Sequence, residues 1–484
     1  MNYALIFKLI GNLLRIQAAL MLFPLAVSFI YGGGDHLPFL WSILILALTG
    51  TFLTLLKPVN KNFRTKDAFA TAGLAWIFMS LFGALPFYFS GYFNSFIDSA
   101  FESISAFTTT GTTILTDIEV LPHGILFWRS FSHWIGGIGV LVFMLAVMPS
   151  MNASSINLLR AESTGPLPDK IVPKIRETAK IMCIIYLVTT VVLGVLLYFA
   201  GLPVYDAVIN SFSTAGTGGF SRMNGSIAAY NNVAAEIIII IFMFLFGISF
   251  SLYFFLLGRK FLKFFKDAEL KLYTGLVVAA IVIITINIYG IYGNFAEALR
   301  RSSFQVVSIA STTGFSNADV GLWPGLSQII LALLMFTGSC AGSTGGGIKL
   351  IRILLLIKAT RIEFIRIFHP GSVKAVSINN KTVGQDIVSK TALFFFIYFV
   401  ILFWAAVFIT IEGKDMVSSV TAALSSLSNV GPGLGTAGSN GNYSSFSALS
   451  KIVLSFCMIA GRLEFLPVLV LFSPAVWKKI PRKS

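Results

Sequence analysis

The sequence predicts an all-α membrane protein with about ten transmembrane helices, in which four similar units follow an N-terminal helix pair. Composition is the first reason. Of 484 residues, 56% are hydrophobic and 11% are charged, which is too apolar for a soluble chain of this length. Apolar stretches long enough to cross a bilayer are the second reason. The third is a short polar motif that occurs four times between these stretches.

Ten apolar stretches are long enough to span a membrane, since a helix needs about 20 residues to cross about 30 Å of hydrocarbon. The first stretch carries Lys8 and Arg15 and no small-residue cleavage site follows it, so we interpret it as a retained helix rather than a signal peptide. The stretches cover approximately residues 4–31, 37–56, 68–92, 126–148, 179–200, 233–257, 272–292, 326–361, 388–411 and 447–476.

The connections between these stretches differ in charge on the two sides of the predicted membrane. One side is nearly free of lysine, and the positive-inside rule makes the other side cytoplasmic, with both termini there. We interpret the net charge of +15 through this topology and anionic lipid, not nucleic acid, with a docking surface for a cytosolic partner as the alternative. The basic clusters are Lys57, Lys61, Arg64 and Lys66; Arg160, Lys170, Lys174 and Arg176; Arg259, Lys260, Lys263 and Lys266; and Lys478, Lys479, Arg482 and Lys483.

No residue pattern indicates an enzyme or a bound metal cofactor. The three cysteines lie in or beside separate apolar segments without CxxC spacing, so nothing suggests a disulfide framework. The histidines are scattered, and neither HExxH nor GxSxG occurs. We expect no catalytic residues and no organic cofactor. The residues considered are Cys183, Cys340 and Cys457, and His36, His123, His133 and His369.

The repeated motif lies in the connections on the side that is nearly free of lysine, opposite the predicted cytoplasmic side. Its four copies start at Phe101, Ile209, Phe304 and Thr421 and align without gaps. One such Ser/Thr/Gly-rich stretch would be read as a packing surface or a turn, but four in register at one topological position are not explained in that way. Two positions are the same in every copy, a serine at the fifth and a glycine at the eleventh: Ser105, Ser213, Ser308 and Ser425, then Gly111, Gly219, Gly314 and Gly431.

The repeat implies a unit of span, short half-helix, glycine loop and span, which is pore-loop architecture. Irregular backbone at membrane depth is tolerated only when it is buried in protein or lines a water-filled cavity, so we expect the four loops to surround one pore. The predicted division is an N-terminal helix pair at 1–66 and pore repeats at 67–150, 151–270, 271–386 and 387–484.

Main-chain carbonyl groups are the ligands that such loops offer to an ion. A glycine at positive φ turns its neighbours' carbonyls without a Cβ clash. A ring of these oxygens replaces the hydration shell of a monovalent cation. The half-helices would direct the negative ends of their dipoles toward the same point. The motif therefore predicts a filter for a monovalent cation.

The motif loops and three further segments resemble the Trk/Ktr/HKT superfamily of potassium transporters, and the helix pair before residue 60 is similar to its TrkH-like Trk branch. The resemblance implies a homodimer in the bacterial inner membrane that takes up potassium, with one pore per subunit. It also implies gating by a cytosolic nucleotide-binding ring protein of the TrkA type. The three segments are Trp128–Val140 (WRSFSHWIGGIGV), Gly338–Lys349 (GSCAGSTGGGIK) and Gly461–Phe465 (GRLEF).

The resemblance also assigns the potassium-filter positions. In this superfamily a serine in place of the first filter glycine goes with sodium permeation, so Gly111 favours potassium. The fourth loop departs most from the others, and its fourfold symmetry is only approximate. The filter residues are Thr109, Thr110 and Gly111; Thr217, Gly218 and Gly219; Thr312, Thr313 and Gly314; and Asn429, Val430 and Gly431.

A glycine-rich interruption and Arg462 are candidates for a gate. Arg462 and Glu464 both lie inside the last apolar stretch, where a charged side chain is costly and usually functional. Each glycine costs a helix about 1 kcal/mol relative to alanine, so the third unit's second helix must break there. The resemblance makes this segment an intramembrane gate and places Arg462 beside it, whereas a passive kink, or a structural pair between Arg462 and some carboxylate, is the alternative. Arg129 is interpreted as an interface anchor, and Gly136, Gly137 and Gly139 as packing residues. The gate residues are Gly342, Ser343, Thr344, Gly345, Gly346, Gly347 and Arg462.

Two other functions stay open on the residues alone. The same scaffold could be permeable to sodium, or could be a secondary transporter that couples potassium to protons or sodium as a symporter. Transporters with inverted repeats also place broken helices at the bilayer midplane, but they are built from units other than span, loop and span.

Overall fold

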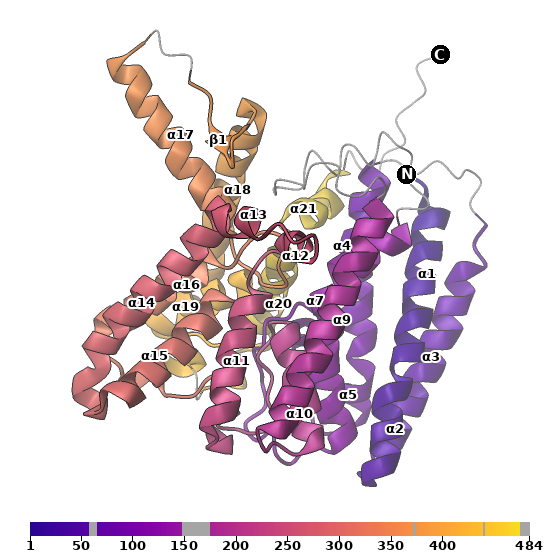
Figure 1. The fold of residues 1–484 in the computed structure, drawn as a ribbon. Coiled ribbons are helices and arrows are strands. Elements are labelled where there is room, and N and C mark those ends of the chain that lie inside the picture. Colours follow the sequence, from indigo (N-terminus) through magenta and orange to yellow (C-terminus); the bar gives the residue numbers. More distant parts are fainter. Residues whose placement is uncertain (58–64, 148–174, 371–373, 439–440, 475–484) are drawn as a thin grey trace, which may run out of the picture.

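The computed structural model describes residues 1–57, 65–147, 175–370, 374–438 and 441–474, which form a bundle of helices (Figure 1). Most of the long helices lie roughly along one common axis, and the start of α1 lies at the same end of the bundle as α21. Of the basic residues predicted to be cytoplasmic, Lys61, Arg64, those from 160 to 174, and those after residue 474 lie outside the described residues.

The N-terminal region forms three helices. The first apolar stretch becomes α1 (Tyr3–Leu20) and α2 (Leu22–Tyr31), which meet at Met21, and the second becomes α3 (His36–Thr54). A Cβ atom at Gly11 of α1 would come within 2.6 Å of the carbonyl oxygen of Gly50 in α3. The two backbones therefore approach closely, as is typical of membrane helices with small residues at the contact.

Four short helices of 12 to 16 residues, α6, α10, α15 and α19, are each followed by an irregular loop. In chain order the helices are α4 (Thr65–Gly83), α5 (Leu85–Phe89), α6 (Phe96–Phe107), α7 (His123–Val147), α9 (Ile175–Phe199), α10 (Val204–Ala215), α11 (Val233–Phe246), α12 (Phe250–Leu257), α13 (Phe261–Lys266), α14 (Ala268–Tyr292), α15 (Phe295–Ala310), α16 (Gly325–Thr337), α17 (Leu350–Phe368), α18 (Gln385–Ile411), α19 (Met416–Ser428), α20 (Ala448–Arg462) and α21 (Leu466–Phe472). Short 3₁₀ turns occur at Ser226–Tyr230, Val320–Leu322 and Gly435–Ala437.

Within the described residues, six helices are long and apolar enough to cross a membrane, or seven if one bent pair counts as a single span. The bent pair is Val233–Phe246 with Phe250–Leu256, at 97°. Two of the ten predicted stretches, 4–31 and 68–92, contain a one-residue break and still count as single spans, and three others are interrupted more strongly. The stretch 233–257 bends, 326–361 divides into α16 and α17 at the glycine-rich segment, and 447–476 divides into α20 and α21.

The units follow one another around a ring. The short helix of each unit packs against a helix of the preceding unit: α10 against α7, α15 against α11, and α19 against α16. The first short helix, α6, packs in the same way against α20 of the last unit. The order of contacts is therefore cyclic, and the short helices lie toward the centre, where α6 and α19 are mostly buried.

One element projects from the bundle. Helix α17 and the start of α18 extend beyond the other helices at the end where α1 begins (Figure 1). Between them, strands β1 (Ser377–Ile378) and β2 (Lys381–Thr382) pair antiparallel. Asn379 and Asn380 make the turn with φ of 50° and 62°, a left-handed conformation that asparagine accepts in two-residue hairpins.

Candidate functional site: a ring of four loops

The four motif loops, residues 109–111, 217–219, 312–314 and 429–431, adopt the same backbone conformation. The first residue of each is left-handed, with φ of 55°, 53°, 60° and 54° at Thr109, Thr217, Thr312 and Asn429. The third is a glycine with φ of 83°, 76°, 84° and 106° at Gly111, Gly219, Gly314 and Gly431. Glycine adopts this conformation without a steric penalty, whereas a threonine is held in it by its surroundings.

The motif serines hold each loop to the end of its short helix. The N–H of the second loop residue donates to the serine carbonyl oxygen in every copy: Thr110 to Ser105 at 2.9 Å, Gly218 to Ser213 at 2.8 Å, Thr313 to Ser308 at 2.8 Å and Val430 to Ser425 at 3.0 Å. Two serine hydroxyls also reach the far side of the loop, since Ser308 donates to the carbonyl of Phe315 and Ser425 to that of Gly431, both at 2.7 Å. The repeated serine therefore has a structural role.

Each motif loop packs against the next through its glycine. An added Cβ would collide with a main-chain oxygen of the following loop in all four cases: Gly111 with Gly218, Gly219 with Thr313, Gly314 with Val430, and Gly431 with Thr110. Because this order closes on itself, the four loops form a ring of main chain, which we call the loop ring. The structure thus brings together all twelve filter positions predicted from the sequence.

A cavity of about 150 Å³ lies beside the loop ring and touches all four motif glycines. Its other polar lining comes from hydroxyl and amide groups, such as Thr112, Ser316 and Asn442, and from Arg129. No carboxylate belongs to this lining in the described part of the chain. A cation that entered from the cavity would therefore meet main-chain and hydroxyl oxygens, the ligands that suit a monovalent ion.

A buried ion pair supports the first loop from behind. Glu102 of α6 accepts hydrogen bonds from Thr113 Oγ1 at 2.9 Å and from the N–H of Ile114 at 3.1 Å, and it pairs with Arg129 of α7 at 2.7 Å. The side chains of Arg129 and Glu102 are 1% and 0% exposed. The prediction that Arg129 anchors the helix at the membrane interface is therefore wrong, because a carboxylate on the neighbouring short helix neutralises it inside the protein.

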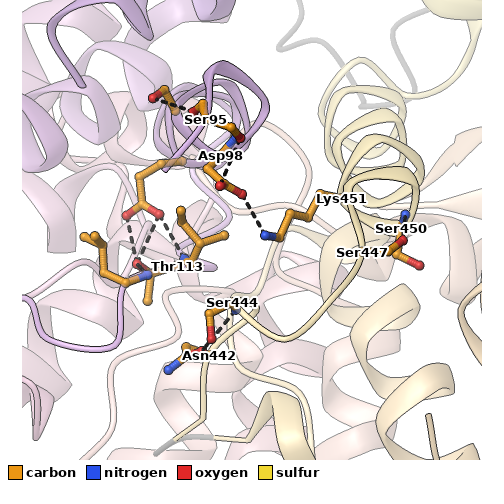
Figure 2. Close-up of polar contacts among 12 residues, drawn as sticks. Ser95, Asp98, Thr113, Asn442, Ser444, Ser447, Ser450 and Lys451 are labelled. Atoms are coloured by element: carbon orange, nitrogen blue, oxygen red, sulfur yellow. Dashed lines mark hydrogen bonds and ion pairs between the residues drawn. The ribbon is translucent and has the colours of Figure 1, made fainter. Parts of the chain in front are cut away.

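A second ion pair joins the last unit to the first. Figure 2 shows Lys451 of α20 extending toward Asp98 of α6, and its Nζ lies 2.7 Å from Asp98 Oδ1. Ser95 fixes the position of Asp98 by capping α6, since its Oγ accepts the N–H of Asp98 at 3.1 Å and donates to Asp98 Oδ2 at 3.0 Å. The ion pair of Lys451 and Asp98 therefore lies at the contact between α20 and α6, where the last unit meets the first.

The fourth loop departs from the others through Asn429. Its Nδ2 donates to Thr110 Oγ1 and to the carbonyl oxygen of Met458, both at 2.9 Å. The corresponding threonines of the other loops have no amide with which to make such a bond. Asn429 therefore ties the fourth loop to the first, and the loop ring is not fourfold symmetric in its side chains.

The glycine-rich segment Gly338–Lys349, which we call the inner loop, lies against the loop ring. The N–H of Gly346 donates to Thr312 Oγ1 at 2.7 Å. A Cβ at Gly345 would come within 2.7 Å of the carbonyl oxygen of Ser311, and one at Gly346 would collide with that of Ser428. The inner loop therefore contacts the ends of α15 and α19, and it includes the predicted gate residues Gly342, Ser343, Thr344, Gly345, Gly346 and Gly347.

The two charged residues predicted in the last span have different partners. The guanidinium of Arg462 donates to the carbonyl oxygen of Thr344 in the inner loop at 2.7 Å and to that of Gly136 in α7 at 2.8 Å. Glu464 instead pairs with Arg352 of α17. Glycines 136 and 137 pack as expected, because a Cβ at Gly136 would collide with the Phe107 carbonyl.

Sequence reasoning missed two residues that hold the inner loop, Glu269 from outside it and Lys349 at its end. Glu269, at the start of α14, accepts the N–H groups of Ala341 at 2.7 Å and Ile351 at 3.0 Å through one oxygen. Lys349 is buried, and its Nζ donates to the carbonyl of Gly345. In the sequence, Glu269 looks like an acidic residue in a helix's first turn, so only the buried location reveals its second role.

The fold defines a multi-pass helical membrane protein whose four loops form a central ring. The chain matches the family model TrkH, described as cation transport protein, over residues 39–479. It therefore belongs to the TrkH family, which confirms the resemblance seen in its motifs.

Named relatives align along almost the full chain. The Trk system potassium uptake proteins TrkH of Salmonella typhimurium and Halomonas elongata are 36% and 37% identical to it, each over 99% of this chain and 100% of the relative. The fold is also similar to the crystal structure of the potassium transporter TrkH from Vibrio parahaemolyticus, with a TM-score of 0.89 and 31% identity over 99% of this chain and 100% of that one.

Proposed function

We propose that this chain takes up potassium across the bacterial inner membrane and that the loop ring is its selectivity filter. The observation that carries the proposal is the cyclic contact of four motif loops, each with left-handed residues on both sides of a main-chain carbonyl. Such oxygens replace the water around a monovalent cation, and the four short helices direct their negative ends toward the ring. The printed names of the relatives support potassium as the transported ion.

The inner loop is the proposed gate. It supports this role by contacting the ends of two short helices directly beside the loop ring, through the Gly346 to Thr312 hydrogen bond. Arg462 holds it by donating to the Thr344 carbonyl. A passive kink would need neither contact. The inner loop therefore blocks the path and must move before ions pass. Its glycines provide the backbone freedom for that movement.

The proposal also covers the subunit assembly, the regulator and the orientation of the chain in the membrane. The chain acts as a homodimer, it is controlled by a cytosolic nucleotide-binding ring of the TrkA type, and both termini are cytoplasmic. The name "Trk system", which the relatives share, supports the presence of further components. The units keep the boundaries 1–66, 67–150, 151–270, 271–386 and 387–484. In this proposal the chain acts as a transporter, without an enzyme reaction or an organic cofactor.

Ion flux in proteoliposomes tests the function. The purified chain is reconstituted with potassium, rubidium or sodium gradients of equal size, and tracer uptake is followed with and without a membrane potential. We expect potassium and rubidium to pass and sodium to pass poorly. Equal sodium flux would favour the sodium-permeable alternative, and accumulation against the electrochemical gradient that requires a co-ion would favour a secondary transporter.

A further inference from the structure

The second motif copy lacks side chains where the first and third copies have them. In the first copy, the hydroxyls of Thr108 and Thr110 lie 2.8 Å apart behind the loop, and in the third copy those of Ser311 and Thr313 lie 2.7 Å apart. These pairs brace the eighth motif residue against the tenth. The second copy has glycine at both positions, Gly216 and Gly218, and makes no such bond.

Backbone conformation does not explain these two glycines. Gly216 has φ of −69°, an ordinary helical value, and Gly218 is absent from the described residues with positive φ. Both positions accept an L-residue as far as the main chain is concerned. The reason must therefore be space.

His133 occupies that space, with its ring at Gly218 and its main chain at Gly216. A Cβ at Gly218 would collide with ring atoms Nδ1 and Cγ of His133, whereas a Cβ at Gly216 would come within 2.4 Å of the main-chain carbonyl oxygen of His133. His133 comes from α7 of the preceding unit, so one unit fills the gap behind the loop of the next. The sequence had suggested no role for this residue beyond a scattered histidine.

Packing rather than hydrogen bonding holds His133 in place. Its exposed fraction is 0%, and its ring stacks on that of Phe220 with centroids 4.2 Å apart and 26° between planes. Neither ring nitrogen has a hydrogen-bond partner among the residues that the structure describes. The imidazole thus acts here as a flat, rigid spacer between α7 and the loop.

We propose that His133 is a positioning residue of the filter: its ring takes the place of the side chain that Gly218 lacks and sets the position of the carbonyl oxygens of residues 216–218. The inference rests on the proposed function of the loop ring. Since selectivity between cations depends on carbonyl positions, removing the ring should change which ions pass more than it changes assembly. The role is steric, so an apolar ring should serve and a methyl group should not.

The test is a compensation experiment on the full chain in proteoliposomes. The variants are H133A, H133F, G218T and the double variant H133A/G218T, with H123A as a matched loss of an imidazole elsewhere on α7. The readouts are the potassium to sodium permeability ratio, potassium flux, and the elution profile of the purified protein. The G218T change supplies the threonine that the first and third copies carry at this motif position, as Thr110 and Thr313.

We expect H133A and G218T each to lower the permeability ratio by about tenfold, which corresponds to about 1.4 kcal/mol of lost discrimination between the two ions, while H133F and H123A keep it. The double variant should recover most of the ratio lost in either single variant. If H133A alone misfolds, recovery of folding and selectivity in the double variant supports the proposal. An unchanged ratio in folded H133A, an H133F variant as defective as H133A, or a double variant no better than the singles would overturn it. Absence of potassium flux in the wild-type chain would instead refute the proposed function.

Discussion

Arg462 near the end of α20 donates a hydrogen bond of 2.7 Å to the main-chain carbonyl oxygen of Thr344 in the inner loop. The same guanidinium reaches Gly136 of α7 at 2.8 Å. One side chain therefore connects the last unit, the inner loop of the third unit and a helix of the first. Because arginine stays protonated, this contact also keeps a fixed positive charge beside the inner loop.

The first prediction concerns this contact. Arg462→Gln removes a charged donor, and hydrogen bonds to charged groups contribute about 1.5–3 kcal/mol. We expect the inner loop to leave its position more often and rubidium flux without the cytosolic regulator to rise by about tenfold, since about 1.4 kcal/mol corresponds to a factor of ten. Tracer uptake into proteoliposomes measures this. The control is Arg366→Gln, at an exposed end of α17, and wild-type flux in folded Arg462→Gln would contradict the gate.

A second prediction concerns the brace on the other side of the inner loop. Glu269→Ala leaves the N–H groups of Ala341 and Ile351 without their acceptor, and each unsatisfied buried donor costs about 1–3 kcal/mol. We expect higher flux without the regulator, together with a lower thermal unfolding temperature. Glu269→Gln keeps an acceptor oxygen at the same place, so it should lie between wild type and alanine in both measurements. A glutamine variant more severe than the alanine variant would show that the contact is not the cause.

The loop ring is the part of the site that the sequence predicts best. Its residues form a repeat, and four aligned copies of Ser105 and Gly111 carry a pattern that no single copy shows. The broken helix at Gly338–Lys349 was also predictable, because a run of glycines excludes a continuous helix whatever surrounds it.

What lies behind the loops was not predictable in the same way. Glu102 and Arg129 are 27 residues apart and meet only because α7 packs beside α6. Asp98 and Lys451 are 353 residues apart. The second pair depends on the cyclic order of the units, which one sequence does not state. Likewise, Gly218 looks like a flexible filter residue until the ring of His133 is seen in the space beside it.

The third prediction concerns the first motif glycine. Gly111 has φ of 83°, and a Cβ there would collide with the carbonyl oxygen of Gly218. Gly111→Ser should therefore displace the second loop and lower the potassium to sodium permeability ratio by about tenfold. Gly91→Ser is the control, because Gly91 has φ of 77° but nothing within 4 Å of its added Cβ. If both variants lower the ratio equally, backbone strain rather than displacement of the neighbouring loop is responsible.

The last prediction concerns the buried pair of Arg129 and Glu102. Removing one partner leaves an uncompensated buried charge, which costs about 3–5 kcal/mol, whereas replacing both partners with apolar residues of similar volume is often neutral. Arg129→Met and Glu102→Leu should each lower the unfolding temperature of the detergent-solubilised protein strongly, and the double variant should recover much of the loss. Glu102 also holds Thr113 and Ile114, so the stable double variant should still show reduced selectivity. Full recovery of both stability and selectivity would mean that the pair only compensates charge, while additive losses would mean that the two residues do not act together.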